Sequence, residues 1–133
     1  MSKAAFTVKA FGVYLLLLGI ALVLVPNLLL GLFGIPSTSE VWIRVVGLLA
    51  FNIGMYYWYA ANSEARPFFS ASVYVRAAVP VVFIAFVALG LVSPLLVLFG
   101  IIDLAGAVWT FIALRKERHV ATHPSPFRTE SQT

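Results

Sequence analysis

The chain has 133 residues, of which 62% are hydrophobic and 11% are charged, with a net charge of +4. Soluble domains are about 45–50% apolar and about 25% charged, and a domain of this size buries only about two thirds of its surface. The composition therefore excludes an ordinary soluble enzyme, a nucleic-acid-binding module and a disordered chain, and it favours a protein surrounded by lipid. The absence of cysteine excludes disulfides, thiolate metal sites and CxxC thiol relays.

Four stretches of the chain are apolar over about the length that a helix needs to cross a bilayer, which is roughly 20 residues. They cover residues 5–25, 41–60, 74–91 and 94–114. We predict that all four are membrane-spanning helices. The fold class is then all-α, an integral membrane four-helix bundle formed by residues 1–114.

The connections between these stretches differ in length. Pro26 suits the first position of a new helix, so residues 27–33 are predicted to form a short amphipathic segment at the membrane surface. The alternative is one long kinked helix that continues to Gly34. Ser93 and Pro94 form a very short turn, which predicts an antiparallel hairpin of the last two helices. Residues 115–133 are polar and are predicted to form a disordered cytoplasmic tail.

The distribution of lysine and arginine predicts the orientation of these helices. Eight basic residues fall on one side of the predicted membrane, and the other side carries only Arg44. The eight are Lys3, Lys9, Arg66, Arg76, Arg115, Lys116, Arg118 and Arg128. Because cytoplasmic loops are rich in Lys and Arg, both termini are predicted to be cytoplasmic.

Asp103 is the acidic residue that falls within a predicted span, about 14 Å deep at 1.5 Å per residue. A carboxylate at this depth is costly, so we expect Asp103 to face the interior and to have a partner. Arg44 is the favoured ion-pair partner. The alternatives are that Arg44 extends to the outer headgroups or pairs with Glu40, and Arg76 is expected to extend to the cytoplasmic headgroups.

Polar side chains on the other helices could complete a site around Asp103. Asn52, Tyr56 and Tyr59 follow an i, i+4, i+7 spacing that places them on one face of the second span. Tyr14 lies at a similar depth in the first span. We interpret Asp103, Arg44, Asn52, Tyr56, Tyr59 and Tyr14 as a buried polar cluster or ligand site. Interhelical hydrogen bonding and a structural clamp around Asp103 are the alternatives.

Three features together resemble a known family. A segment from Pro26 to Gly34 follows the first helix, the second helix opens with Arg44-x-x-Gly47, and the last helix carries Asp103-Leu104-Ala105-Gly106-Ala107. This pattern resembles the DoxX-like group of small four-helix membrane proteins, in which the acid is commonly Glu. The resemblance implies a bundle in a bacterial plasma (inner) membrane. Some members of the group look like membrane subunits of quinone-linked oxidoreductases.

These observations lead to three functional hypotheses. The favoured one is a non-enzymatic membrane protein that binds a small lipophile or serves as an accessory subunit of a membrane complex. The second is a dimeric proton-coupled exporter that uses Asp103, and the third is a subunit that hosts quinone. No catalytic residue and no metal ligand is predicted, and quinone is the one cofactor that the hypotheses admit. The expected partners are membrane lipid and a second copy or a larger complex, not nucleic acid.

Overall fold

The computed structural model describes residues 1–122, and all the regular elements within this range are helical. In chain order these are α1 (Lys3–Leu24), α2 (Pro26–Leu32), α3 (Trp42–Asn62), α4 (Arg66–Ala88), the short 3-10 helix η1 (Pro94–Leu96) and α5 (Val97–Thr122). The prediction of an all-α helical bundle is confirmed.

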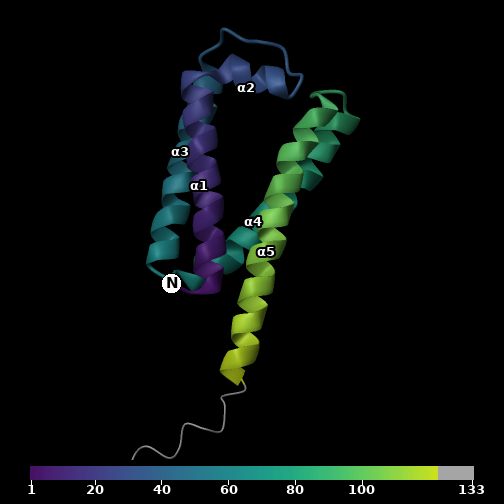
Figure 1. Ribbon diagram of the computed structural model, residues 1–133. Coiled ribbons are helices and arrows are strands. Elements are labelled where there is room, and N and C mark those ends of the chain that lie inside the picture. Colours follow the sequence, from purple (N-terminus) through teal and green to yellow (C-terminus); the bar gives the residue numbers. More distant parts are fainter. Residues whose placement is uncertain (123–133) are drawn as a thin grey trace, which may run out of the picture.

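The long helices form two antiparallel pairs, α1 with α3 and α4 with α5 (Figure 1). The pairs meet at the end of the molecule that holds the N-terminus, which we call the narrow end. They separate toward the opposite end, the wide end, where α2 lies across the space between them. The bundle is therefore a wedge rather than a parallel-sided barrel of helices.

Glycines determine how closely α1 and α3 approach each other. Gly12 lies against Gly54, and Gly19 lies against Gly47, so the two contacts are seven residues apart on each helix. A Cβ atom at any of these four positions would lie 2.6–2.9 Å from an atom of the partner helix. Small residues allow helices to approach closely in lipid, where the hydrophobic effect does not drive helix association.

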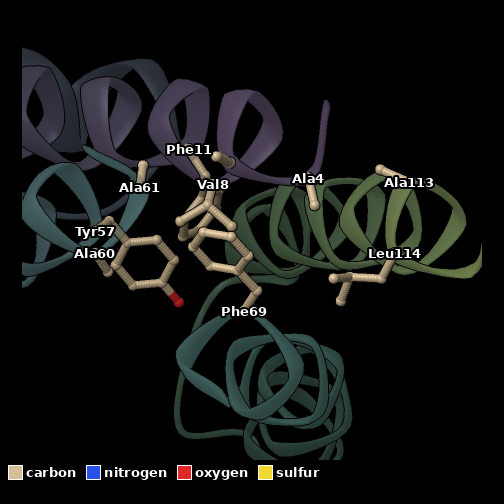
Figure 2. Close-up of a cluster of buried hydrophobic side chains, with 10 residues drawn as sticks. Ala4, Val8, Phe11, Tyr57, Ala60, Ala61, Phe69, Ala113 and Leu114 are labelled. Atoms are coloured by element: carbon tan, nitrogen blue, oxygen red, sulfur yellow. The ribbon is translucent and has the colours of Figure 1, made fainter. Parts of the chain in front are cut away.

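The buried core lies at the narrow end (Figure 2), where both helix pairs meet. Its residues are mostly small, which permits the convergence of the helices, and aromatic rings fill the centre. The labelled members are Ala4, Val8, Phe11, Tyr57, Ala60, Ala61, Phe69, Ala113 and Leu114. No comparable cluster of buried side chains occurs at the wide end within residues 1–122.

Two helix boundaries differ by eight residues from those expected. α4 begins at Arg66 rather than at residue 74, and α5 continues to Thr122 rather than ending at residue 114. Hydropathy identifies the residues that suit lipid, whereas a helix extends as far as its residues favour helical backbone geometry. The predicted disorder of residues 115–122 is therefore wrong, and residues 123–133 of the predicted tail lie outside the described part of the chain.

Glu117 shows why the end of α5 is ordered. Its Oε1 accepts a hydrogen bond of 3.1 Å from the backbone N–H of Ala4, and its Oε2 lies 2.7 Å from Nη1 of Arg66. The carboxylate thus binds an unpaired N–H group in the first turn of α1, where helices favour negative charge. Glu117, which lies in the region expected to be a tail, is instead anchored to the narrow end.

The segment after α1 is a separate helix, as expected from Pro26. α1 ends at Leu24, and α2 begins with Pro26 in its first turn. Gly34, with φ of +64°, follows the end of α2, and the N–H of Ile35 donates to the carbonyl of Leu30. The alternative of one continuous kinked helix to Gly34 is wrong.

Three segments are long and apolar enough to cross a membrane: α1, α4 and the stretch Pro94–Thr122 that contains η1 and α5. These segments indicate a membrane protein. α3 is also long, with 21 residues, but Arg44, Asn52 and its tyrosines lower its hydropathy. Hydropathy alone therefore does not place α3 in the bilayer.

Candidate functional site

A cavity of about 390 Å³ lies at the wide end, between the two helix pairs and beneath α2. All five α-helices, η1 and the connection after α2 contribute to its wall. The lining residues are Tyr14, Leu15, Leu18, Leu22, Leu29, Leu30, Phe33, Ile35, Ile43, Val46, Phe83, Leu96, Phe99 and Asp103. This volume lies in the range of ligand pockets, which are about 300–1,000 Å³.

The cavity is apolar except at its inner end. Asp103 is the only charged residue of its lining, and Tyr14 is the other residue with a polar side-chain group. At the opposite end Phe33 contacts Phe99, with ring centroids 4.1 Å apart. Phe33, which directly follows α2, thereby links this short helix to α5.

Arg76 is one of the most deeply buried side chains in the described chain, with 2% of its surface exposed. It lies near the middle of α4 and directs its guanidinium toward α1 and α5. Its Nε donates to the carbonyl of Ser72 over 3.3 Å, and its Nη2 donates to Oγ of Ser72 over 3.2 Å. Nη2 also donates to Oγ1 of Thr110 over 2.8 Å.

The hydrogen bonds continue from Arg76 through two threonines to α1. Oγ1 of Thr110 lies 2.8 Å from Oγ1 of Thr7, which in turn donates to the carbonyl of Ala4 over 2.7 Å. Because Thr7 uses its only proton on Ala4, Thr110 is the donor to Thr7. This direction leaves the Thr110 oxygen free to accept from Arg76. The chain of bonds connects α4, α5 and α1 inside the bundle.

Aromatic rings and a glycine surround the rest of the guanidinium. Its Cζ lies 4.5 Å from the ring centroid of Phe11 and 5.6 Å from that of Tyr57, within the range of cation–π attraction. A Cβ at Gly106 would lie 3.0 Å from Nη1, so this glycine provides the space for the guanidinium. Nη1 itself is buried and has no hydrogen-bond partner within residues 1–122.

Asp103 lies one turn of α5 from Gly106, on the cavity side of Arg76. Along the α4–α5 hairpin, Gly100 faces Pro80 and Gly106 faces Arg76, which places Asp103 between these two levels. No ion pair joins Asp103 to Arg76, and Arg66–Glu117 is the one ion pair in the described part of the chain. The carboxylate is half-buried and faces the cavity without a direct hydrogen bond from residues 1–122.

The structure brings together two of the six predicted site residues. Asp103 and Tyr14 line the same cavity, as their similar depth suggested. The predicted pairing of Arg44 with Asp103 is wrong. Arg44 is exposed, and its Nη1 donates to the carbonyl of Val23. The last carbonyls of a helix lack partners within the helix, so a cation at the start of α3 caps the end of α1.

The other three predicted residues lie on one face of α3, as their spacing predicted, but this face points outward. Asn52 is exposed, and Tyr56 and Tyr59 expose 66% and 64% of their surface. The opposite face of α3, with Gly47 and Gly54, packs on α1. Asn52, Tyr56 and Tyr59 therefore do not line the cavity that contains Asp103.

Sequence reasoning missed Arg76, which it placed at the cytoplasmic headgroups. Two signals could have identified it. Ser72 precedes Arg76 by one turn on the same face, and Gly106 and Thr110 follow Asp103 on one stripe of the antiparallel neighbour. A small residue and a hydroxyl on the facing helix offer space and an acceptor to a buried guanidinium.

No group of three or more His, Cys, Asp or Glu side chains that could hold a metal ion gathers within residues 1–122. The cavity residues instead offer a carboxylate and a phenol for hydrogen bonds, and aliphatic and aromatic surface for van der Waals contact. Scans against family models, curated proteins and solved structures each find no match to this chain.

Proposed function

We propose that the chain is a plasma membrane protein that crosses the bilayer four times, with α3 as the fourth span. α3 packs along α1 through both glycine pairs. A 21-residue helix is about 32 Å long, close to the thickness of the hydrocarbon core. Since α1 is one of the strongly apolar helices, α3 enters the membrane with it.

The charge distribution over the wedge supports an orientation with both termini in the cytoplasm. The narrow end carries Lys3 and Arg66 together with the basic end of α5. Within the described chain, the wide end carries Arg44 as its one Lys or Arg residue. By the positive-inside rule the narrow end is cytoplasmic. This arrangement also agrees with the resemblance to the DoxX-like group, which implies a bacterial plasma membrane.

Reporter fusions test this topology. Four spans place the loop at Thr38 and the end of α5 at Lys116 on opposite sides of the membrane. If α3 remained outside the bilayer, three spans would place both positions on the same side. Reporters that show Thr38 and Lys116 in one compartment would therefore refute the four-span arrangement.

The function that the geometry supports best is the binding of a small lipophile. The observation that carries this proposal is the cavity of about 390 Å³ with an apolar wall and a carboxylate and phenol at its inner end. An apolar wall with a few converging polar groups is typical of small-molecule sites. The ligand is expected to place its polar group at Asp103 and Tyr14 and its apolar body beneath α2.

A quinone is the second candidate, because three phenylalanine rings line the same space. Phe33, Phe83 and Phe99 offer aromatic surface to a ring, and Tyr14 offers a hydrogen bond to a carbonyl oxygen. A short-chain quinone should then raise the melting temperature of the purified protein. Binding of this probe to the ligand-free protein stabilises it in proportion to ln(1 + [L]/Kd).

Two neighbouring leucines of α1 provide a matched test of the cavity. Leu18 lines the cavity, whereas Leu17 is exposed on the outside of the bundle. Mass spectrometry of organic extracts should find a small lipophile with the wild-type protein and with Leu17→Phe, but much less with Leu18→Phe. Equal amounts of every co-purified lipid in all three proteins would refute the proposal.

Asp103→Asn tests the role of the carboxylate in the same assay. It keeps the shape of the side chain and removes its charge, so a ligand held by the carboxylate should be lost from a protein that still folds. A Tyr14→Phe variant should weaken binding less, because one neutral hydrogen bond contributes about 0.5–1.5 kcal/mol. Ligand content that follows thermal stability alone would instead indicate a structural role for Asp103.

A further inference from the structure

A row of exposed side chains runs along the outer face of α3. Its members, which we call the α3 stripe, are Val45, Leu49, Asn52, Tyr56 and Tyr59, and all five are exposed. Their spacing of four, three, four and three residues is that of the a and d positions of a heptad repeat. The opposite face of α3, with Gly47 and Gly54, packs on α1, so in a single copy of the chain the stripe faces away from α1. In Figure 1, α1 lies between α3 and the α4–α5 pair.

The centre of the α3 stripe is poorly suited to contact with lipid. Asn52 lies ten residues after the start of α3, about 15 Å along a helix that we have proposed to span the membrane. Its side chain makes no hydrogen bond within residues 1–122 that would satisfy the amide. An amide that faces hydrocarbon without a partner is costly, and polar residues in spans therefore tend to lie between helices.

The chemistry of the stripe matches a second copy of itself. An asparagine amide carries both a donor and an acceptor, so two facing Asn52 side chains can satisfy each other. A two-fold axis along the membrane normal brings the same residue of each copy to the same depth. A heptad stripe on each helix then allows the two α3 helices to pack at a small crossing angle, as most membrane helices do.

We propose that the α3 stripe is a homodimer interface, in which α3 packs against α3 of a second copy and Asn52 pairs with Asn52 of that copy. This inference rests on the proposed insertion of α3 into the bilayer but not on the ligand. It also accounts for the division of the two faces of α3. The glycine face packs within one copy, and the opposite heptad face packs between copies.

The natural absence of cysteine allows a clean test in native membranes. Single variants Leu49→Cys and Tyr56→Cys place a thiol on the stripe, and Leu48→Cys and Ile53→Cys place one on exposed positions beside it. Leu48 and Ile53 expose 54% and 46% of their surface, which makes them matched controls. Under mild oxidation the stripe variants should form disulfide-linked dimers, and the controls should form far fewer.

Asn52→Val in the Leu49→Cys background tests the amide. Loss of an interhelical hydrogen bond of this kind weakens association by about threefold to tenfold, so the yield of crosslinked dimer at low protein density should fall accordingly. The variants Asn52→Ser and Asn52→Gln should keep part of the yield that Asn52→Val loses. An unchanged yield with Asn52→Val would show that the amide pair does not form.

The topology reporters separate the two ways in which the inference can fail. Uniform or absent crosslinking at all four positions, with Thr38 and Lys116 on opposite sides of the membrane, would overturn the dimer and leave the four spans intact. Crosslinking of Leu48 and Ile53 in preference to Leu49 and Tyr56 would also overturn it. Thr38 and Lys116 on the same side would instead overturn the proposed insertion of α3.

Discussion

The glycine contacts between α1 and α3 lead to a quantitative prediction for Gly19→Ala. At Gly19 a Cβ atom would lie 2.6 Å from the carbonyl oxygen of Gly47 and 2.6 Å from the backbone nitrogen of Phe51. Both atoms belong to the backbone of α3 and cannot rotate away. The substitution therefore has to push the two helices apart.

The size of the effect follows from these distances. Non-bonded heavy atoms are most stable at about 3.5–4.0 Å, so α1 and α3 must separate by about 1 Å at this level. Overpacking of this kind typically costs about 1–3 kcal/mol. We expect Gly19→Ala to lower the free energy of unfolding by about 2–3 kcal/mol. At Gly12 the closest atom lies at 2.9 Å, so a smaller loss of about 1–2 kcal/mol is expected there.

Two other glycines provide controls for this experiment. Gly31 lies in α2, and a Cβ atom there would meet no other atom within 4 Å, so Gly31→Ala should be neutral or stabilise by up to about 1 kcal/mol. At Gly106 the nearest atom is the flexible Nη1 of Arg76 at 3.0 Å. Gly106→Ala should therefore cost less than Gly19→Ala but more than Gly31→Ala.

Circular dichroism during unfolding by SDS in mixed micelles measures these differences on one scale. The expected order of stability is Gly31→Ala, Gly106→Ala, Gly12→Ala and Gly19→Ala, from the most to the least stable. If Gly19→Ala and Gly31→Ala unfold within about 0.5 kcal/mol of each other, the helices do not approach as closely as the structure indicates, and the reasoning is refuted.

Three further predictions concern charged groups. Hydrogen bonds from the Ser2 hydroxyl and N–H lower the pKa of Glu64 below its ordinary 4.5. The contribution of Glu64 to stability is thus complete above pH 4.5 and is lost as the pH falls through the lowered pKa. The melting temperature of Glu64→Gln should therefore fall less than that of the wild type when the pH is lowered through this range. Glu117→Gln should lower the melting temperature by weakening the bond to Ala4, and high salt should reduce the difference. Arg76→Met should leave the melting temperature within a few degrees of wild type, because an apolar side chain of similar size can replace a buried charge. Arg76→Ala should lower the melting temperature strongly, because it leaves a cavity in the core.

The course of the chain could largely be predicted from the sequence, because lipid restricts the choice of structure. Apolar stretches of about 20 residues predict helices, and Pro26 predicted the start of a second short helix. The ends of α4 and α5 could not be predicted in this way. Residues 66–73 and 115–122 are helical without being strongly apolar, and Glu117 is ordered by a contact with Ala4 that is distant in sequence.

The depth of a polar residue could be predicted where the ends of its helix were, but its direction could not. The depth of Arg76 was wrong, because α4 begins at Arg66 rather than at residue 74. Because the rise per residue along a helix is almost constant, the estimated depths placed Asp103 and Tyr14 at a similar level. Both residues line the same cavity. The same argument placed Arg44 near Asp103, although Arg44 satisfies the unpaired carbonyl of Val23. Spacing alone placed Asn52 and its tyrosines on one face, and it could not show that the glycine face would turn inward.

The wedge shape follows from where the chain places its small and its polar residues. Small residues, mostly alanines, let the two helix pairs converge at the narrow end, and hydroxyls and aromatic rings enclose the guanidinium of Arg76 between the pairs. The two helix pairs lie farther apart at the wide end, where leucines and phenylalanines line the space between them and α2 lies across it. Asp103 lies where one region passes into the other. It lies one turn of α5 from Gly106, the glycine that faces the buried arginine, and it also lines the cavity. A protein that required only a stable bundle would gain nothing from an unpaired carboxylate at this boundary, and its position there supports the binding of a ligand.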